Sequence, residues 1–118
     1  MTRVPYMLPL QIELVEYIDE TGFNPFGTWF RDLDSGAAAR IRIALSRLAR
    51  GAHSNLKGVG DGVLEYRIDT GPGHRVYLAK RGSDFILLLG GGSKRRQAED
   101  ISAAKRRWAT FKSRQKEK

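Results

Sequence analysis

Two arginines on adjoining segments of this chain are well placed for chemistry. Arg67 and Arg75 lie in the stretches GVLEYRID and HRVYLAK, where apolar and polar residues alternate as they do in strands. If the apolar residues face a core, both arginines lie on the opposite face of a hairpin. Adjacent guanidinium groups repel each other unless an anion lies between them, and arginine can bind phosphate through two hydrogen bonds. The pattern predicts a phosphate-binding face, or else a surface ladder in which Glu65 and Asp69 neutralise the arginines.

A second cationic feature follows the last apolar run, in the stretch LLLGGGSKRRQAED. Its spacing fails the Walker A pattern, because Ser93 precedes Lys94, and it also fails the GxGxxG pattern of dinucleotide-binding folds. Glycines at the end of a strand still allow a backbone or a substrate to approach closely. Lys94 and Arg95 would then lie at the rim of a sheet, near the start of a helix whose free N–H groups favour anions. The alternative is an ordinary turn before a basic helix.

Other polar and aromatic side chains add little to this pair of features. Tyr77 shares its predicted face with Arg67 and Arg75, so it could stack on a nucleic-acid base. His53 and His74 have no partners at metal-ligand spacing, which predicts no metal site, and nothing in the sequence calls for a cofactor. His74 flanks a turn next to Arg75 and could carry a proton. The large aromatics on helical stripes are expected in the core.

The charge distribution favours a polyanionic partner. The formal net charge is +8. Residues 1–50 hold six basic and six acidic residues, so the whole excess lies in residues 51–118. Such asymmetry is typical of proteins that bind nucleic acid, although basic tails are also common on small proteins. The chain has no cysteine and no apolar run long enough to span a bilayer, and its first residues do not resemble a secretory signal; we therefore expect a cytoplasmic protein.

Periodicity and capping residues predict the elements of the N-terminal half. Residues 12–18 resemble a strand. Asn24 is a good N-cap for a helix with Pro25 at its first position, and a second helix is predicted over residues 37–50, ending before Gly51. The expected apolar stripes of the two helices are Phe26, Trp29, Phe30 and Leu33, and Ile41, Ala44, Leu45 and Leu48.

The C-terminal half is predicted to form three strands and a helix. The two hairpin strands are followed by FILLLG, a continuous apolar run that suits a central strand covered on both faces. A basic helix should span residues 96–112, and residues 1–9 and 113–118 should be flexible. The order β-α-α-β-β-β-α indicates a single α+β domain over residues 1–118. In it, a small antiparallel sheet of about four strands packs against an N-terminal helical hairpin and a C-terminal helix.

The stretches NPFGTWFRDLDSGAAARIRIALSRLARG and GVGDGVLEYRIDTGPGHRVYLAKRGSDFILLLGGGSKRRQAEDISAAKRR carry a family resemblance. Together they resemble the RelE/ParE toxin superfamily of type II toxin–antitoxin systems, and more narrowly its HigB-like branch of addiction module killer proteins. The likeness runs from about Phe23 to Trp108 in the expected element order. It implies a RelE-like fold. The chain departs from the family pattern at two points, since its last helix has no tyrosine and His74 replaces the usual aromatic residue before the arginine.

The resemblance also implies roles for particular residues. In the ribonuclease members, basic residues on the sheet and in a neighbouring loop promote attack of an RNA 2′-hydroxyl on its own 3′-phosphodiester, without a metal ion. Arginine does not give up its proton, so its part would be to stabilise charge on the phosphorane, while a lysine among the cations, Lys94, or His74 would move protons. The expected catalytic residues are Arg67, Arg75, Lys94 and Arg95, and those expected to bind RNA are Lys57 in a loop, His74, Tyr77 and Arg96.

The expected function is therefore a metal-independent endoribonuclease that cleaves mRNA, on the ribosome, and halts translation. The resemblance also implies a cognate antitoxin, here a helix-turn-helix DNA-binding protein. The alternative within the superfamily is a ParE-like poison that binds DNA gyrase and has no catalytic set. A third possibility is a remnant that binds nucleic acid without cleaving it. The basic residues favour the ribonuclease.

Overall fold

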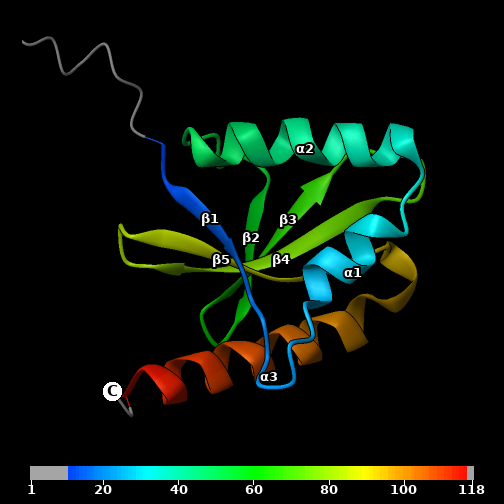
Figure 1. Ribbon diagram of the computed structural model, residues 1–118. Coiled ribbons are helices and arrows are strands. Elements are labelled where there is room, and N and C mark those ends of the chain that lie inside the picture. Colours follow the sequence, from blue (N-terminus) through cyan, green and yellow to red (C-terminus); the bar gives the residue numbers. More distant parts are fainter. Residues whose placement is uncertain (1–10, 117–118) are drawn as a thin grey trace, which may run out of the picture.

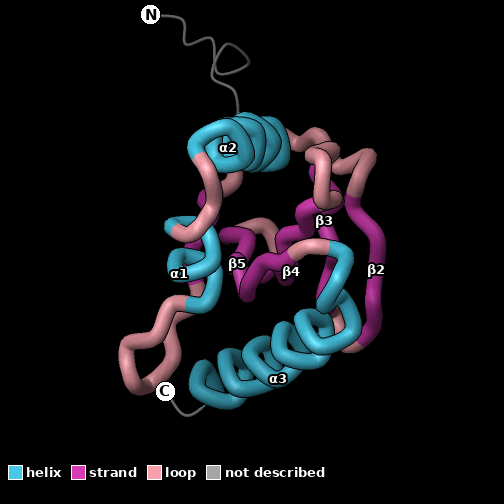
Figure 2. The backbone as a smooth tube through the Cα atoms, turned by 90° about the vertical axis from the view of Figure 1, so that its right-hand side faces the viewer, coloured by secondary structure: helices cyan, strands magenta, loops and turns pink. Residues whose placement is uncertain are grey.

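The computed structural model describes residues 11–116 and consists of a five-stranded sheet between helices (Figures 1 and 2). Its elements are β1 (Glu13–Glu16), α1 (Pro25–Arg31), α2 (Ser35–Ala49), β2 (Leu56–Gly60), β3 (Val63–Ile68), β4 (His74–Arg81), β5 (Phe85–Gly92), the 3-10 turn η2 (Lys94–Arg96) and α3 (Gln97–Lys116). α1 and α2 cover one face of the sheet, and α3 covers the other. The predicted α+β class is confirmed.

The strand order is β1-β5-β4-β3-β2, with every neighbouring pair antiparallel except β1 and β5. The prediction of about four strands missed β2. Its segment, LKGVG, carries two glycines, which are rare in strands, and was expected to be a loop. The stretch does hold a hairpin signal, because Asp61 and Gly62 form the turn between β2 and β3 with positive φ angles of 57° and 83°. The first strand, predicted over residues 12–18, spans only Glu13–Glu16.

The face toward α1 and α2 forms the first core. Asn24 caps α1 by accepting a hydrogen bond from the amide of Gly27, and Pro25 occupies the first helical turn, as predicted. α2 begins two residues earlier than predicted, because the Asp34 side chain accepts a hydrogen bond from the amide of Ala37 and acts as N-cap. Its stripe residues Ile41, Leu45 and Leu48 are buried, as expected. They pack against Tyr66, Ile68, Val76, Leu78, Ile86 and Leu88 of the sheet.

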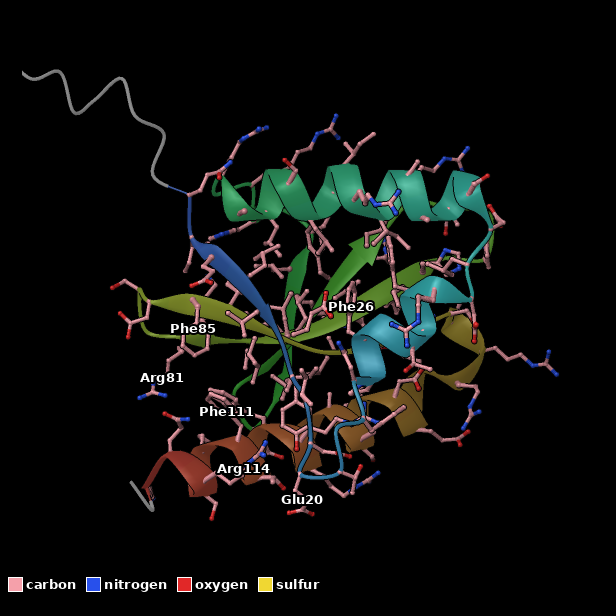
Figure 3. All side chains as sticks on the ribbon, viewed as in Figure 1. Glu20, Phe26, Arg81, Phe85, Phe111 and Arg114 are labelled. Carbon is pink, nitrogen blue, oxygen red and sulfur yellow. The ribbon has the colours of Figure 1, made fainter. Side chains whose placement is uncertain are left out.

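The face toward α3 forms the second core. Ala104 and Trp108 of α3 pack there against Val63, Tyr77, Ala79, Leu87 and Leu89. β5 contributes to both cores, which confirms that the run FILLLG is a central strand. Figure 3 shows the two cores: Phe26 of α1 lies on one side of the sheet, and Phe85 and Phe111 lie between β5 and α3 on the other. The rings of these last two meet edge to face at 6.1 Å.

α3 is longer than predicted, since residues 113–116 continue the helix where a flexible tail was expected. The predicted flexible segment 1–9, together with residues 117–118, lies outside the described residues. Over residues 11–116, no helix combines the length and apolar character needed to cross a membrane.

The glycines at the end of β5 allow the protein's own side chains to approach the strand. A Cβ at Gly91 would overlap the indole of Trp29 on the α1 face, and one at Gly92 would overlap the carboxylate of Asp100 from α3. Trp29 has little room to move, because it packs against Phe26 and His74 with centroid distances of 5.8 Å each. The sequence predicts that a backbone or a substrate approaches these glycines closely. In the structure, side chains of α1 and α3 make this approach instead.

We expect Gly91→Ala to lower the free energy of unfolding by about 1–3 kcal/mol, the usual cost of overpacking a core. Gly58→Ala is the matched control, because an added Cβ there meets nothing within 4 Å. Urea unfolding followed by circular dichroism compares the two variants with the wild type. Equal midpoints for both variants would mean that Trp29 is not closely packed on the strand.

Candidate nucleic-acid site

Four of the predicted cations converge on the α3 face of the sheet, next to the first turn of α3: Lys57, Arg67, Arg75 and Lys94. Strand register places Lys57 of β2 beside Glu65 of β3, and Arg67 of β3 beside Arg75 of β4. Directly opposed residues on one face have Cβ atoms about 4.5–5.5 Å apart. The hairpin prediction is therefore confirmed: the two arginines are neighbours on the face opposite Tyr66, Val76 and their apolar companions.

A cavity of about 480 Å³ opens over these residues. η2 and the start of α3 form its far wall and contribute Lys94 and Gln97. Four cations and one carboxylate, Glu65, line this space, so its surroundings carry an excess of positive charge. We call it the basic cavity, and its lining is Ser54, Asn55, Leu56, Lys57, Glu65, Arg67, Arg75, Lys94 and Gln97.

Glu65 is the buried centre of the basic cavity, with 4% of its surface exposed. Its Oε2 accepts hydrogen bonds from the Tyr77 hydroxyl at 3.2 Å and from the Gln97 amide at 2.7 Å. Its Oε1 lies 3.5 Å from Nε of Arg75. A buried carboxylate requires such partners, because desolvation of an unpaired charge is costly. Glu65 therefore ties β3, β4 and the start of α3 together beneath the cations.

Arg75 is held rigidly at the bottom of the cavity. Only 6% of its surface is exposed, and its Nη1 donates a hydrogen bond of 2.8 Å to the carbonyl of Gly73. Its Nε is buried and makes no hydrogen bond with any of the described residues, although it faces Glu65. A guanidinium group fixed in this way needs no reorganisation to act on a developing negative charge. Arg67 and Lys94, by contrast, are exposed around it.

The surface-ladder alternative is only partly correct. Glu65 does pair with Arg75, but the pair is buried, and Asp69 is exposed and takes no part in it. One carboxylate stands against the charges of Lys57, Arg67, Arg75 and Lys94. An anion such as a phosphodiester would complete this electrostatic balance.

The prediction that Tyr77 stacks on a base is wrong. Tyr77 does share a face with the arginines, but α3 covers that face and leaves 0% of the residue exposed. Burial, together with the nearby Glu65 carboxylate, raises the pKa of the Tyr77 hydroxyl far above its usual range. The hydroxyl therefore remains a hydrogen-bond donor and supports the site from below.

The prediction that His74 joins Arg75 at the RNA site is also wrong, because neighbouring residues of a strand point to opposite faces. His74 is buried on the α1 face, where its ring meets Trp29 edge to face. Its Nδ1 lies 2.8 Å from the hydroxyl of Thr70. This position removes His74 from the candidates for proton transfer in the basic cavity.

The two arginines of the GGGSKRRQAED stretch lie outside the basic cavity. Arg95 is exposed on η2, and its catalytic role stays a prediction. Arg96 is exposed as well and forms an ion pair of 2.9 Å with Glu99 in the next turn. It lines a separate hollow with His74 and Asp100, so the structure does not bring it to the four cations.

Two members of the site were not predicted from the sequence. The sequence predicts Glu65 only as a surface counter-charge and gives no role to Gln97. An acidic residue on the same face as two arginines was the available signal for Glu65, whereas Gln97 depends on where α3 begins. Lys57 was expected in a loop, but it lies on β2. Among residues 11–116, no group of His, Cys, Asp and Glu side chains could hold a metal ion.

Comparison with known proteins identifies a relative of this chain. No family model matches the chain. An uncharacterized protein of Haemophilus influenzae is 41% identical to it over 81 residues, which is 68% of this chain and 82% of that protein. Such identity over most of the relative's length goes with a shared fold. The chain therefore belongs to the same family as this Haemophilus influenzae protein.

Proposed function

We propose that this protein is the toxin of a type II toxin–antitoxin system, a metal-independent endoribonuclease that cleaves mRNA in the cytoplasm. The observation that supports this most is the convergence of Lys57, Arg67, Arg75 and Lys94 on one cavity, with Arg75 oriented by a buried carboxylate. The sequence resemblance to HigB-like killer proteins supports the same function. A binding protein would need the charges, but it would not need one of them immobilised.

The reaction forms a bond between the RNA 2′-oxygen and the adjacent phosphorus and breaks the bond from that phosphorus to the 5′-oxygen, while the proton of the 2′-hydroxyl passes to solvent water. The products are a 2′,3′-cyclic phosphate and a free 5′-hydroxyl. Arg75 would stabilise the negative charge that develops on the phosphorane oxygens. Arg67 would bind the same phosphate from the exposed side. Lys94 would donate a proton to the leaving 5′-oxygen, a role open to an ammonium group at the cavity wall.

Translation stops when mRNA is cut, so such an enzyme requires an inhibitor in the same cell. We infer a cognate antitoxin that covers or distorts the basic cavity, in the form of a helix-turn-helix DNA-binding protein. We also infer that cleavage takes place on ribosome-bound mRNA. Both inferences come from the family resemblance.

Arg67→Ala/Lys94→Ala tests the ribonuclease directly. Both side chains are exposed, so their removal should leave the fold intact, whereas Arg75 is buried against Glu65. Expressed without antitoxin, the wild type should arrest growth and create new 5′ ends within coding sequences. The double variant should lose at least about 10²-fold in cleavage, as expected when charge stabilisation of the phosphorane is lost. Mapping 5′ ends in cellular RNA measures this effect.

The matched control is Arg106→Ala/Lys116→Ala, which removes two exposed cations from further along α3. It should cut mRNA as the wild type does. Growth arrest with intact mRNA would contradict the ribonuclease proposal, and inhibition of DNA gyrase supercoiling would then identify a ParE-like poison.

A further inference from the structure

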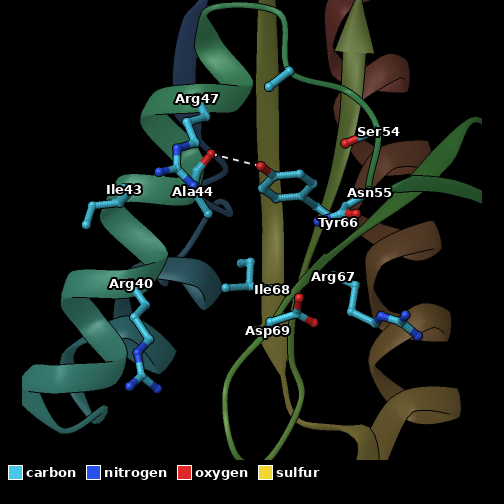
Figure 4. Close-up of a pocket in the computed structure, with 11 residues that line it drawn as sticks. Arg40, Ile43, Ala44, Arg47, Ser54, Asn55, Tyr66, Arg67, Ile68 and Asp69 are labelled. Carbon is cyan, nitrogen blue, oxygen red and sulfur yellow. Dashed lines mark hydrogen bonds between the residues drawn. The ribbon is translucent and has the colours of Figure 1, made fainter.

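A second basic hollow lies on the other face of the sheet, between α2 and β3. Its volume is about 390 Å³. Figure 4 shows Arg40 and Arg47 extending from α2 on one side, and Asn55 and Arg67 on the other. We call it the α2 groove; it is lined by Arg40, Ile43, Ala44, Arg47, Ala52, Ser54, Asn55, Tyr66, Arg67, Ile68 and Asp69.

The α2 groove is firmly built, although its arginines are exposed. The Tyr66 hydroxyl donates a hydrogen bond of 2.9 Å to the carbonyl of Ala44 and so fixes α2 against β3. Burial raises the pKa of this hydroxyl, and the positive charge of Arg47 partly offsets the shift. The positive charge of Arg47 therefore reaches the Tyr66 hydroxyl, which lines the groove.

The charge around the groove is one-sided. Residues 35–60 contain five basic residues and no acidic one, a feature concealed when the N-terminal half is counted as a whole. The acidic residues of that half all precede α2. In the groove itself, Asp69 is the one carboxylate against Arg40, Arg47 and Arg67. No described ion pair neutralises Arg40 or Arg47 within residues 11–116.

The α2 groove and the basic cavity share a border. Ser54, Asn55 and Arg67 line both. Arg67 points away from α2 toward the α3 side (Figure 4), so it lies where one hollow passes into the other. A nucleic-acid strand bound in the basic cavity can therefore continue over this border and remain on positively charged surface.

We propose that the α2 groove binds single-stranded RNA nucleotides that flank the phosphodiester held in the basic cavity. This inference rests on the proposed function. Arg40 and Arg47 are seven residues apart on one helix, about 10 Å along its axis, so they contact different phosphates. Ile43 lies between them and is 53% exposed, which offers an apolar surface to a base. The groove thus adds affinity along the strand without adding a catalytic group.

Binding of a non-cleavable RNA of two lengths tests the groove. We would titrate the wild type and Arg40→Gln/Arg47→Gln with 2′-O-methyl oligonucleotides, a trimer and a dodecamer, by fluorescence anisotropy at several salt concentrations. The double variant should bind the dodecamer about tenfold more weakly, and its salt slope should fall by about 1.4, since each phosphate contact on a single strand contributes about 0.7. Its affinity for the trimer should equal that of the wild type.

Arg106→Gln/Lys116→Gln removes the same charge elsewhere and should retain the dodecamer affinity of the wild type. If it weakens binding as much as the groove variant does, net charge alone explains the effect and the inference is wrong. Unchanged dodecamer binding by the groove variant, with weaker binding of poly-glutamate, would assign the groove to an acidic protein and overturn the inference.

The two proposals fail in different ways. If the wild type binds neither oligonucleotide, the proposed function fails and the groove inference fails with it. If Arg67→Ala/Lys94→Ala weakens trimer binding while the groove variant behaves as the wild type with both lengths, only the groove inference is overturned.

Discussion

Glu65→Ala should lower the free energy of unfolding by about 3–5 kcal/mol, the usual cost of removing one partner from a buried ion pair. The substitution would leave the Arg75 guanidinium buried beside a cavity, and the Tyr77 hydroxyl and Gln97 amide without their acceptor. Net stabilities of single domains are about 5–15 kcal/mol, so much of the fold's margin depends on this carboxylate. Urea unfolding at neutral pH measures the loss.

Removing the charge of Glu65 can be separated from removing its side chain. Glu65→Gln keeps an oxygen acceptor and loses only the charge, so its loss should be smaller than that of Glu65→Ala. In a double-mutant cycle, Glu65→Ala/Arg75→Ala should be less destabilised than the sum of the single variants, because neither charge is then left alone. Additive losses would show that the two side chains are not energetically coupled.

Arg75→Lys should lower RNA cleavage by about 10²–10³-fold, the range found when one preorganised donor is removed from a transition state. Lysine keeps the charge but lacks the planar set of donors that Gly73 and Glu65 hold in place. The loss should fall on kcat, with KM changed far less, since the exposed cations still bind the phosphate. Single-turnover cleavage of a short RNA measures it, corrected for the folded fraction.

Arg81→Lys is the control on the same strand. Arg81 lies at the other end of β4, where its Nη1 donates a 3.3 Å hydrogen bond to Gln115, and this change should leave cleavage intact. Full activity of a folded Arg75→Lys variant would mean that charge alone suffices and that the orientation of Arg75 has no catalytic part.

The local patterns in the sequence were sufficient for most of the fold. Asn24 and Pro25 predicted the start of α1, and the alternation around Arg67 and Arg75 predicted which face they share. Each of these features depends on residues a few positions apart. The same alternation cannot tell whether a face is open or covered, because that depends on where a distant helix packs. Tyr77 was therefore assigned to the correct face, but it lies under α3.

The errors in the predicted site have the same origin. Adjacency in the sequence predicts His74 beside Arg75, but the side chains of adjacent strand residues point to opposite faces of the sheet. Glu65 becomes central only because α3 brings Gln97 over it. Residue type and position, on the other hand, predict Arg67, Arg75 and Lys94, the family resemblance adds Lys57, and the structure gathers all four in one cavity.

The parallel pairing of β1 with β5 has a consequence for how the chain is made. Glu13 is paired with Phe85, a separation of 72 positions (85 − 13). During synthesis from the N-terminus, β1 has no partner until β5 has left the ribosome, and contacts so distant in sequence form slowly. Lys94 and Gln97 follow β5, so the basic cavity is completed later still. A nascent chain carries an unfinished sheet and no complete site until Gln97 has been translated and has left the ribosome.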